Sequence, residues 1–578
     1  MSRTSVHRLI GVLALVLIAA FAPAVSSSAA PPAQHVGPVQ HNPLLKQVLS
    51  GEHDTVDTPA LSALCQDYIG KPNPYANPAP NVDQIVGDTT VTAGSQTGCS
   101  SAQNETTIAV NPNNPRNLVA GTNDYRIFNA REQRNDGSGW AYTTFDGGRT
   151  WKNVQLPHLT FQTGAHGALS YMDSAGDPVI AFGPHNTVYY GNIAFSRAAP
   201  TAGGSQAASA IVLNTSHDGG LHWSEPVIIQ LDGVTSAGTP TPTNFFNDKI
   251  WLAADAHSGQ VYVTWTRFTY DSANNYIESP IVVAPSSDYG QHFAAFTRLD
   301  VPLQNPAHGP GLVPFSQGSN PQVGRDGTLY VAYEGTVCAT LACNQPGDHD
   351  VTVVAKSREH GPGYTRSIVD TNYDFPVNPD LGTLALTHEN FRINSYPQLA
   401  YDPTRDQLAV TWNDDRNGLY DATTGASIRT NGDNIVSTSS DGTHWRRPTI
   451  VGTPQDEVFG AIGAYRGVVA VTSYTRHYDP SGINLDYAYW TSSSSDDRGR
   501  PRASIHRITT QSENPQVQFV AQDAHGNIYQ GVFIGDYSAT ALGTDLRLHP
   551  CWTDFRGRPG VTAPNQDAYS QSIYIGHH

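Results

Sequence analysis

The sequence predicts an all-β protein built as a β-propeller, and three observations carry this prediction. Gly (52) and Pro (40) are abundant, Met is rare (2) and charged residues are only 14% of the 578 residues, which is typical of a turn-rich β protein and not of a helical bundle. Short segments with period-two alternation recur, for example at residues 261–265 and 408–412. Units of similar length repeat along the chain, which indicates a solenoid or a propeller.

The number of repeated units predicts seven blades. Four short strands joined by hairpin turns in each unit favour a propeller over a solenoid. A six-bladed ring is the alternative, in which residues 514–536 and 569–575 would complete an N-terminal blade. The first strands of the seven units begin near Glu105, Asp177, Asp248, Asn320, Tyr396, Glu457 and Asp536.

The chain is expected to divide into three parts. Residues 1–30 are predicted to be a signal peptide, because a basic start is followed by an apolar run (9–24) and by small residues at a cleavage position. This run is short for a membrane span, so we expect a secreted, extracellular protein. Residues 31–104 are a Pro-rich N-terminal extension that donates a strand near residues 82–91, and residues 105–578 form the β-propeller.

The five cysteines all follow the predicted signal peptide, and an oxidising destination permits disulfides. Cys338 and Cys343 are expected to form one, in a loop on the ligand-binding face. Cys65 and Cys99 form a second candidate pair within the extension. Cys551 remains and is interpreted as a buried, inert thiol, because no Cys/His nucleophile pattern surrounds it.

An eight-residue motif recurs at residues 144–151, 216–223 and 286–293, with degenerate copies at 357–364, 439–445 and 495–499. It places Ser or Thr first, then Asp, Gly and an aromatic residue. The carboxylate can accept hydrogen bonds from turn amides, Gly can adopt a positive φ, and the aromatic ring can pack between sheets, so the predicted role is structural. The motif resembles the Asp box of the sialidase (bacterial neuraminidase repeat) superfamily. The resemblance implies an Asp-box β-propeller that binds ligands on the face opposite these turns.

Acidic residues at the starts of first strands are followed about 20 residues later by arginines at the ends of second strands, for example Asp248 by Arg267. First and second strands are antiparallel neighbours, so we expect acid–arginine pairs repeated around the ring. Arg416 and Arg476 occupy the matching positions of later units.

Departures from the repeat predict the functional site, because symmetry accounts for the rest. Asp414 and Asp415 exceed what Arg416 alone needs, Glu334 breaks the pattern of the fourth unit, and Tyr474 lies beside Arg476. The candidate catalytic residues are Glu334, Asp414, Asp415 and Tyr474. The candidate substrate-binding residues are Arg392, Arg416, Arg476, His477, Arg267 and Asp248.

Residues 391–394 read Phe-Arg-Ile-Asn and resemble the sialidase Phe-Arg-Ile-Pro segment, with Asn394 in place of Pro. The resemblance implies that Arg392 clamps a substrate carboxylate through two hydrogen bonds. It also implies a glycoside hydrolase for carboxylated sugars, exo-sialidase-like if catalytic. A non-catalytic glycan- or protein-binding propeller and a uronic-acid polysaccharide lyase stay open as alternatives.

The net charge of −17, without a basic run, argues against nucleic acid and anionic membranes as partners. The expected partner is an extracellular glycan or glycoconjugate, and the expected state is a monomer. No cofactor is expected. The one metal considered is a structural calcium ion, near Asp173, Asp177 and Asp248 or in the Asp/Asn loop at residues 271–275.

Overall fold

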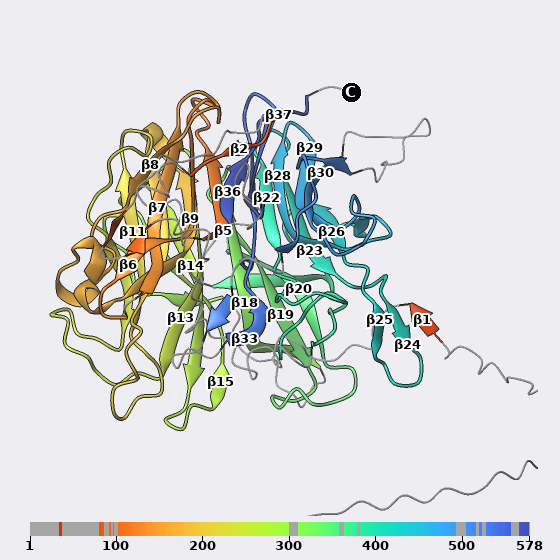
Figure 1. Ribbon diagram of the computed structural model, residues 1–578, viewed down its shortest axis with the longest axis horizontal. Helices are drawn as coiled ribbons and strands as arrows, with labels where there is room; N and C mark the ends of the chain where they lie inside the picture. The colour runs from red at the N-terminus through yellow and green to blue at the C-terminus, as the bar shows by residue number, and fades with distance from the viewer. Residues whose placement is uncertain are drawn as a thin grey trace, which may run out of the picture.

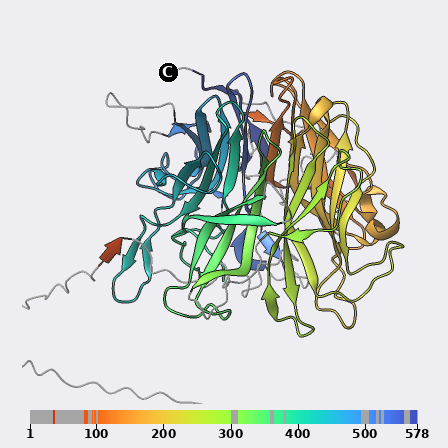
Figure 2. The same ribbon diagram turned by 180° about the vertical axis from the view of Figure 1, so that it is seen from behind.

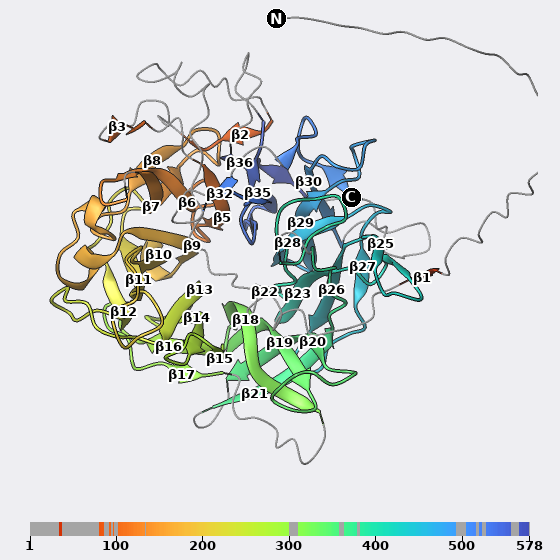
Figure 3. The same ribbon diagram turned by 60° about the horizontal axis from the view of Figure 1, so that its bottom comes forward.

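The computed structural model describes residues 34–36, 80–85, 92–93, 96–97, 102–132, 134–299, 310–357, 363–378, 382–492, 505–515, 520–522, 528–556 and 566–576. These residues form a ring of seven antiparallel sheets (Figure 1, Figure 3). The inner strands of all seven sheets line a central channel. We number the sheets as blades 1 to 7 in chain order. The prediction of an all-β, seven-bladed propeller is confirmed, and the six-bladed alternative is wrong.

Blades 1 to 3 come first in the chain and lie side by side in the ring (Figure 3). From the channel outward, blade 1 consists of β5 (Gln103–Val110), β6 (Leu118–Asn129), β7 (Arg134–Thr144) and β8 (Lys152–Gln155). Blade 2 consists of β9 (Ser174–Phe182), β10 (Val188–Phe195), β11 (Ser209–Ser216) and β12 (Val227–Asp232). Blade 3 consists of β13 (Phe245–Ala254), β14 (Val261–Tyr270), β16 (Ile281–Ser286) and β17 (Thr297–Arg298), with β15 (Tyr276–Glu278) added beside β14.

Blades 4 to 6 repeat this order and form the opposite side of the ring (Figure 2). Blade 4 consists of β18 (Gly311–Val323), β19 (Leu329–Cys338), β20 (His349–Ser357) and β21 (Tyr364–Thr371). Blade 5 consists of β22 (Gln398–Asp402), β23 (Gln407–Asp414), β26 (Asp433–Ser439) and β27 (Thr449–Val451). Blade 6 consists of β28 (Glu457–Tyr465), β29 (Val468–Thr475), β30 (Asp486–Thr491) and β31 (His506–Arg507).

Blade 7 joins the two ends of the chain and thereby closes the ring. Its inner three strands come from the C-terminal part, and its outermost strand is β2 (Val82–Asp83) from the N-terminal extension, which pairs with Tyr569 and Ser570. The expected donation of a strand is confirmed for these two residues. The C-terminal strands are β34 (Ala539–Leu542), β35 (Arg547–Asp554), β36 (Asp567–Ser570) and β37 (Ile573–Tyr574).

A few short elements lie outside the blades. They are the strands β1 (Gln34–Val36), β3 (Thr92–Ala93), β4 (Gln96–Thr97), β24 (Leu419–Asp421), β25 (Ser427–Arg429), β32 (Val520–Gln522) and β33 (Ile528–Val532), and the 3₁₀ helices η2 (Phe161–Thr163), η3 (Gly167–Tyr171) and η4 (Pro184–Asn186). No helix in the described part of the chain has the length and hydropathy needed to cross a membrane.

The eight-residue turns connect the third and fourth strands of their blades, and we call the end of the ring that carries them the motif face. Thr144 Oγ1 donates to Asp146 Oδ1 (2.8 Å), which accepts the N–H of Arg149 (2.9 Å) and of Thr150 (3.1 Å). Partial burial acts to raise the pKa of Asp146, but hydrogen bonds from Thr150 and Thr144 lower it to about 2. The same bonding recurs around Asp218, Asp288 and Asp441. The copies at 357–364 and 495–499 lie partly or wholly outside the described residues.

The aromatic residues of these turns pack against the sheets, though unequally. Trp151 is 7% exposed and packs between blades 1 and 7. Trp223, the aromatic residue of the copy at 216–223, is half-buried and lies edge-on to Tyr190 with ring centroids 5.6 Å apart. Its indole N–H donates to Gly220 O (3.1 Å) within the same turn.

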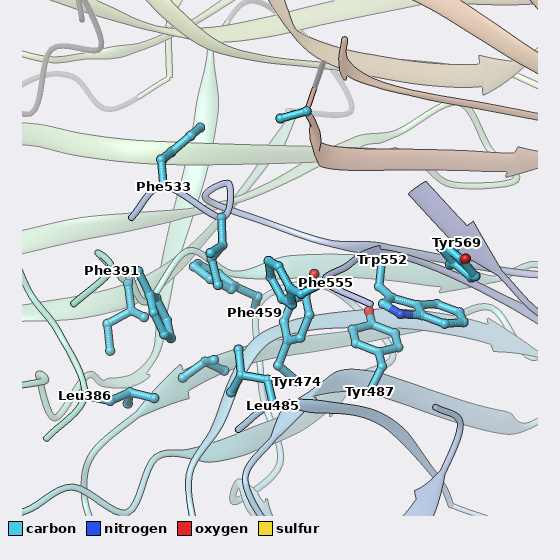
Figure 4. Packing of buried hydrophobic residues seen from close by; sticks show 14 of the residues in the cluster. Leu386, Phe391, Phe459, Tyr474, Leu485, Tyr487, Phe533, Trp552, Phe555 and Tyr569 are labelled. Atoms are coloured by element: carbon cyan, nitrogen blue, oxygen red, sulfur yellow. The ribbon is translucent and has the colours of Figure 1, made fainter. Parts of the chain in front are cut away.

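The interface between blades 6 and 7 is the most aromatic part of the core (Figure 4). Tyr487 stacks on Trp552 with ring centroids 5.2 Å apart, and Tyr474 lies edge-on to Tyr487 at 5.0 Å. Phe391, from the segment that follows blade 4, is fully buried in the same cluster. This burial fixes the backbone on either side of Arg392.

Candidate functional site

The end of the ring opposite the motif face carries the connections between second and third strands and those between blades, and we call it the loop face. The inner strands bulge on the approach to this face, where their register shifts. Non-glycine residues at the bulges have positive φ, namely Glu105 (54°), Asp177 (49°), Lys249 (50°) and Phe459 (55°). A bulge re-aims a side chain, and here the charged ones meet at the channel.

Six charged side chains from different blades meet at the channel, and we call them the channel cluster: Glu105, Asp177, Asp248, Lys249, Arg392 and Asp536. Lys249 from blade 3 bonds to Asp536 at the start of blade 7, and its Nζ lies 3.5 Å from Glu105 Oε1 of blade 1. Arg392 donates Nε to Asp536 Oδ1 (2.7 Å) and Nη2 to Asp536 Oδ2 (2.8 Å). The cluster therefore ties four parts of the ring together across the channel.

Asp177 is an acidic member of the channel cluster whose pKa is raised. Burial raises the pKa of Asp177 well above its usual range, and repulsion from Glu105 and Asp248 adds to this, while Lys249 opposes it. The carboxyl groups of Asp177 and Glu105 are hydrogen-bonded to each other, which requires a proton on one of them. Asp536 differs, because Arg392 and Lys249 lower its pKa in spite of its burial.

A pocket of about 370 Å³ opens on the loop face over blades 1 to 3, and we call it the loop-face pocket. Asp177 and Asp248 both line it. Its walls combine apolar and aromatic groups with amides and hydroxyls, as in small-molecule sites. Among these lining residues are Tyr125, Phe195, Phe246, Asn123, Gln206 and Asn274.

The expected pairing of first-strand acids with second-strand arginines is wrong. The bulges turn Glu105 and Asp177 into the channel, so the arginines bind other carboxylates. Arg197 donates to Asp136 (2.7 Å), and Arg267 binds Asp232 (2.7 Å). Asp248 and Arg267, although on neighbouring strands, thus belong to different networks, with Asp248 in the pocket and Arg267 in a buried ion pair. We call this set of buried or half-buried, paired residues the arginine belt: Arg126, Arg197, Arg267, Arg416, Arg476 and Arg556.

The three arginines proposed to hold a substrate carboxylate bind protein carboxylates in three separate networks. Arg392 binds Asp536, as described above. Arg416 donates to Asp414 (2.6 Å) and to Asp370 (3.0 Å). Arg476 contacts Glu389 (2.7 Å) and Asp456 (2.8 Å). Their substrate-binding role stays a prediction.

The candidate catalytic carboxylates are buried and spread over blades 4 and 5. Burial raises the pKa of Asp414, although its hydrogen bonds from Arg416 oppose the shift. Burial also raises the pKa of Asp415, which accepts hydrogen bonds from Tyr420 and from the N–H of Asn431. Glu334 accepts a hydrogen bond from Asn372 Nδ2 (3.2 Å) and lies close to two further carboxylates.

Tyr474 and His477 are close in sequence, but they differ in burial. The Tyr474 hydroxyl donates to Thr553 O and accepts the Thr553 N–H, both at 2.9 Å, so it joins blade 6 to blade 7. Burial raises the pKa of Tyr474 well above its usual range. His477 is exposed and its ring lies 4.8 Å from that of Tyr478. The catalytic and binding roles of these residues stay predictions.

The carboxylates considered for calcium have protein partners. Asp173 accepts hydrogen bonds from Ser196 Oγ (3.1 Å) and the N–H of Arg197 (2.9 Å), and Asp271 accepts two bonds from Asn275. Among the described residues, the one group of three acidic side chains close enough to share a metal ion is Glu334, Asp350 and Asp374.

Sequence reasoning missed Lys249 and the role of Asp177. A lysine directly after Asp248, at the start of an inner strand, is a local signal for the cation of the channel cluster. The signal for Asp177 was its place among the first-strand acids, but the prediction paired it with an arginine. Asp350 and Asp374 carry no sequence signal, because folding alone brings them beside Glu334.

Two of the three comparisons with known proteins found no match: no protein-family model matches the chain, and no curated protein matches it. Solved structures that match include a Dyadobacter fermentans protein of unknown function (11% identity, 65% of this chain and 91% of that chain, TM-score 0.39). Others are a Penicillium chrysogenum α-L-arabinanase (13% identity, 64% and 88%, TM-score 0.37) and a Trypanosoma rangeli sialidase (12% identity, 74% and 56%, TM-score 0.37). The seven-bladed propeller fold itself rests on the sheet topology described above.

Proposed function

We propose that the protein acts on glycans as a glycoside hydrolase and that the loop-face pocket is its active site. The observation that supports this most directly is the pair of carboxyl groups that line the pocket, one of which has a raised pKa. Hydrolysis of a glycosidic bond uses one carboxyl group as acid and a second as base or nucleophile. Asp177 fits the acid, and Asp248 fits the second group.

The proposed roles follow from the surroundings of each carboxyl group. Asp177 gives a proton to the leaving glycosidic oxygen, because a raised pKa suits a carboxyl group to the role of general acid. Asp248 either bonds to the anomeric carbon itself, and water later displaces it, or takes a proton from the water molecule that bonds to this carbon as the bond to the leaving oxygen breaks. The aromatic rings of Phe195 and Phe246 offer apolar surfaces for a sugar ring, and Asn123 and Gln206 offer partners for its hydroxyl groups.

The charge of the pocket favours a neutral sugar over a carboxylated one. Arg197 lines the pocket, but its guanidinium group is bound to Asp136, and Lys249 is bound to Asp536. Asp248 adds negative charge where the sugar would bind. A carboxylated sugar would need an arginine to exchange its protein carboxylate for the substrate, as the resemblance to sialidases implies for Arg392.

The test is turnover of a panel of fluorogenic glycosides, neutral and carboxylated, together with binding to a glycan array. Asp177→Asn is expected to lower kcat/KM for a cleaved glycoside by at least about a hundredfold, the usual contribution of a general acid. Asp248→Asn is expected to lower it similarly. The control is Asp326→Asn, an exposed carboxylate on a motif-face turn of blade 4, which is expected to behave as the wild type.

Binding without turnover of any glycoside would favour the non-catalytic alternative. Full activity of Asp177→Asn would remove the proposed site. Secretion and cleavage after residue 30 are part of the proposal, and N-terminal sequencing of protein recovered from the culture medium tests them.

A further inference from the structure

Each of the other six blades contributes one arginine to the arginine belt, and blade 4 contributes none. In blades 2, 3 and 6 the arginine follows a second-strand aromatic residue by two positions, and in blades 5 and 7 by four. The corresponding aromatic residue of blade 4 is Tyr333, and the two positions hold Gly335 and Val337. The acidic side chains at this end of blade 4 therefore have no belt arginine of their own.

Three carboxylates gather at this place, and we call them the carboxylate trio: Glu334, Asp350 and Asp374. Glu334 lies in β19, Asp350 in β20, and Asp374 in the connection that leads from β21 toward blade 5. All three are buried, and one oxygen of each lies within 4.8 Å of those of the other two. The nearby Arg416 is occupied by Asp414 and Asp370.

Asp374 distinguishes the trio from an ordinary acidic cluster. It is 6% exposed, and neither of its carboxylate oxygens has a hydrogen-bond partner among the described residues. Asp350 accepts a bond from Thr336 Oγ1 (2.7 Å), and Glu334 accepts one from Asn372 Nδ2 (3.2 Å). A buried carboxylate without a donor is costly unless it is neutralised or coordinates a metal.

We propose that the carboxylate trio binds a divalent cation, Ca²⁺, which replaces in blade 4 the arginine of the other blades. Two oxygens on one Ca²⁺ ion, each about 2.4 Å from it, lie at most about 4.8 Å apart, and the trio meets this limit. Ca²⁺ accepts irregular sets of carboxylate and carbonyl oxygens, whereas Mg²⁺ requires a near-octahedral shell and retains water. Three ligands from two strands and one connection suit the more tolerant ion.

The proposed ion has a structural consequence. Glu334 and Asp350 belong to blade 4, and Asp374 belongs to the connection to blade 5, so the ion fixes the start of that connection against the sheet. The disulfide between Cys338 and Cys343, with Cα atoms 5.2 Å apart, closes the loop that follows β19 at the same end of the blade. The predicted disulfide is thus present on the loop face, beside the trio.

The experiment measures Ca²⁺ binding to the full-length protein after removal of metal with EDTA. Isothermal titration with CaCl₂ and with MgCl₂ gives the affinities, and thermal unfolding with and without CaCl₂ gives the change in Tm. Tb³⁺ serves as a second probe, because Tyr333 and Tyr373 adjoin the ligands in sequence and can sensitise its emission. The variants are Asp374→Asn and Glu334→Gln, and the control is Asp326→Asn in the same blade.

The expected result is that the wild type and Asp326→Asn bind one Ca²⁺ per chain and gain Tm. Asp374→Asn and Glu334→Gln are expected to bind at least about tenfold more weakly. Absence of Ca²⁺ binding by the wild type, with the same Tm in EDTA and in CaCl₂, would overturn the proposal. So would unchanged affinity in both trio variants, or tighter binding of Mg²⁺ than of Ca²⁺. The wild-type titration decides the question alone if the variants do not fold.

Discussion

Replacing Arg392 by alanine tests whether this arginine serves the fold or a ligand. Its guanidinium group makes two hydrogen bonds to Asp536, at 2.7 and 2.8 Å, and lies over the ring of Phe533, with 4.6 Å from Cζ to the ring centroid. The side chain is 14% exposed and that of Asp536 is 2% exposed. Arg392→Ala therefore removes one of the two cations that neutralise a buried carboxylate.

The expected loss in the free energy of unfolding is about 3 kcal/mol. Breaking a buried ion pair by removing one partner costs roughly 3–5 kcal/mol, because a charge is left uncompensated. The lower end applies here, because Lys249 still binds Asp536. Arg392→Lys keeps the charge but not the planar pair of donors, so it is expected to lose less than Arg392→Ala.

Urea denaturation measures this loss, and a double-mutant cycle with Asp536→Asn isolates the pair. The double variant is expected to lose about 1–3 kcal/mol less than the sum of the single variants. The same proteins are tested for turnover of carboxylated glycosides. An Arg392→Ala protein of wild-type stability that no longer binds or cleaves them would refute this reasoning and restore the ligand clamp implied by the sialidase resemblance.

Two further predictions concern buried polar groups in blade 7. Asn81 is fully buried, donates to Ile508 O (2.9 Å) and Gln571 (2.8 Å), and accepts from Arg556 (3.0 Å). Asn81→Ala leaves these groups without this partner, so it is expected to lower the free energy of unfolding by about 3 kcal/mol, as measured by urea denaturation. Unchanged stability would mean that the N-terminal extension contributes little to ring closure. Burial, with a smaller effect of Arg547, lowers the pKa of His549 from 6.5 to about 4. Between these two pH values the unfolded chain binds more protons than the folded protein does, so the free energy of unfolding decreases as the pH falls from about 6.5 to 4. The loss is roughly 3 kcal/mol, and it should be absent in His549→Gln, measured by unfolding at pH 7 and pH 4.

The fold could be predicted because its evidence is local and repeated. Alternation within strands and the Ser/Thr-Asp-Gly-aromatic turns depend on residues that are close in sequence, and the repetition of the unit along the chain averages out the exceptions. The donation of a strand by the N-terminal extension could also be predicted, because blade 7 needs a strand from outside the repeated units to be complete.

The site could not be predicted in the same way, because the bulges decide which residues face the channel. The residue types at positions 177 and 249 do not predict a positive φ, because neither Asp177 nor Lys249 is a glycine. Counting along regular strands placed Asp177 opposite Arg197, whereas the bulge directs Asp177 to Glu105 and leaves Arg197 to Asp136. Such a shift by one position changes the partner of every charged residue at the strand end.

The arginine belt and the channel cluster together explain where functional groups can occur in this ring. A carboxylate that is paired with a belt arginine has its oxygens held by hydrogen bonds to the guanidinium group, so it is poorly placed to bind a ligand or to exchange a proton with one. Chemistry therefore requires acids that escape this pairing. They escape in two ways: bulges carry Asp177 and its neighbours to the channel, where four acids share two cations, and blade 4 lacks its arginine altogether. The loop-face pocket lies at the first of these places and the carboxylate trio at the second. Among the departures from the repeat that the sequence shows, Glu334 belongs to the second of these places.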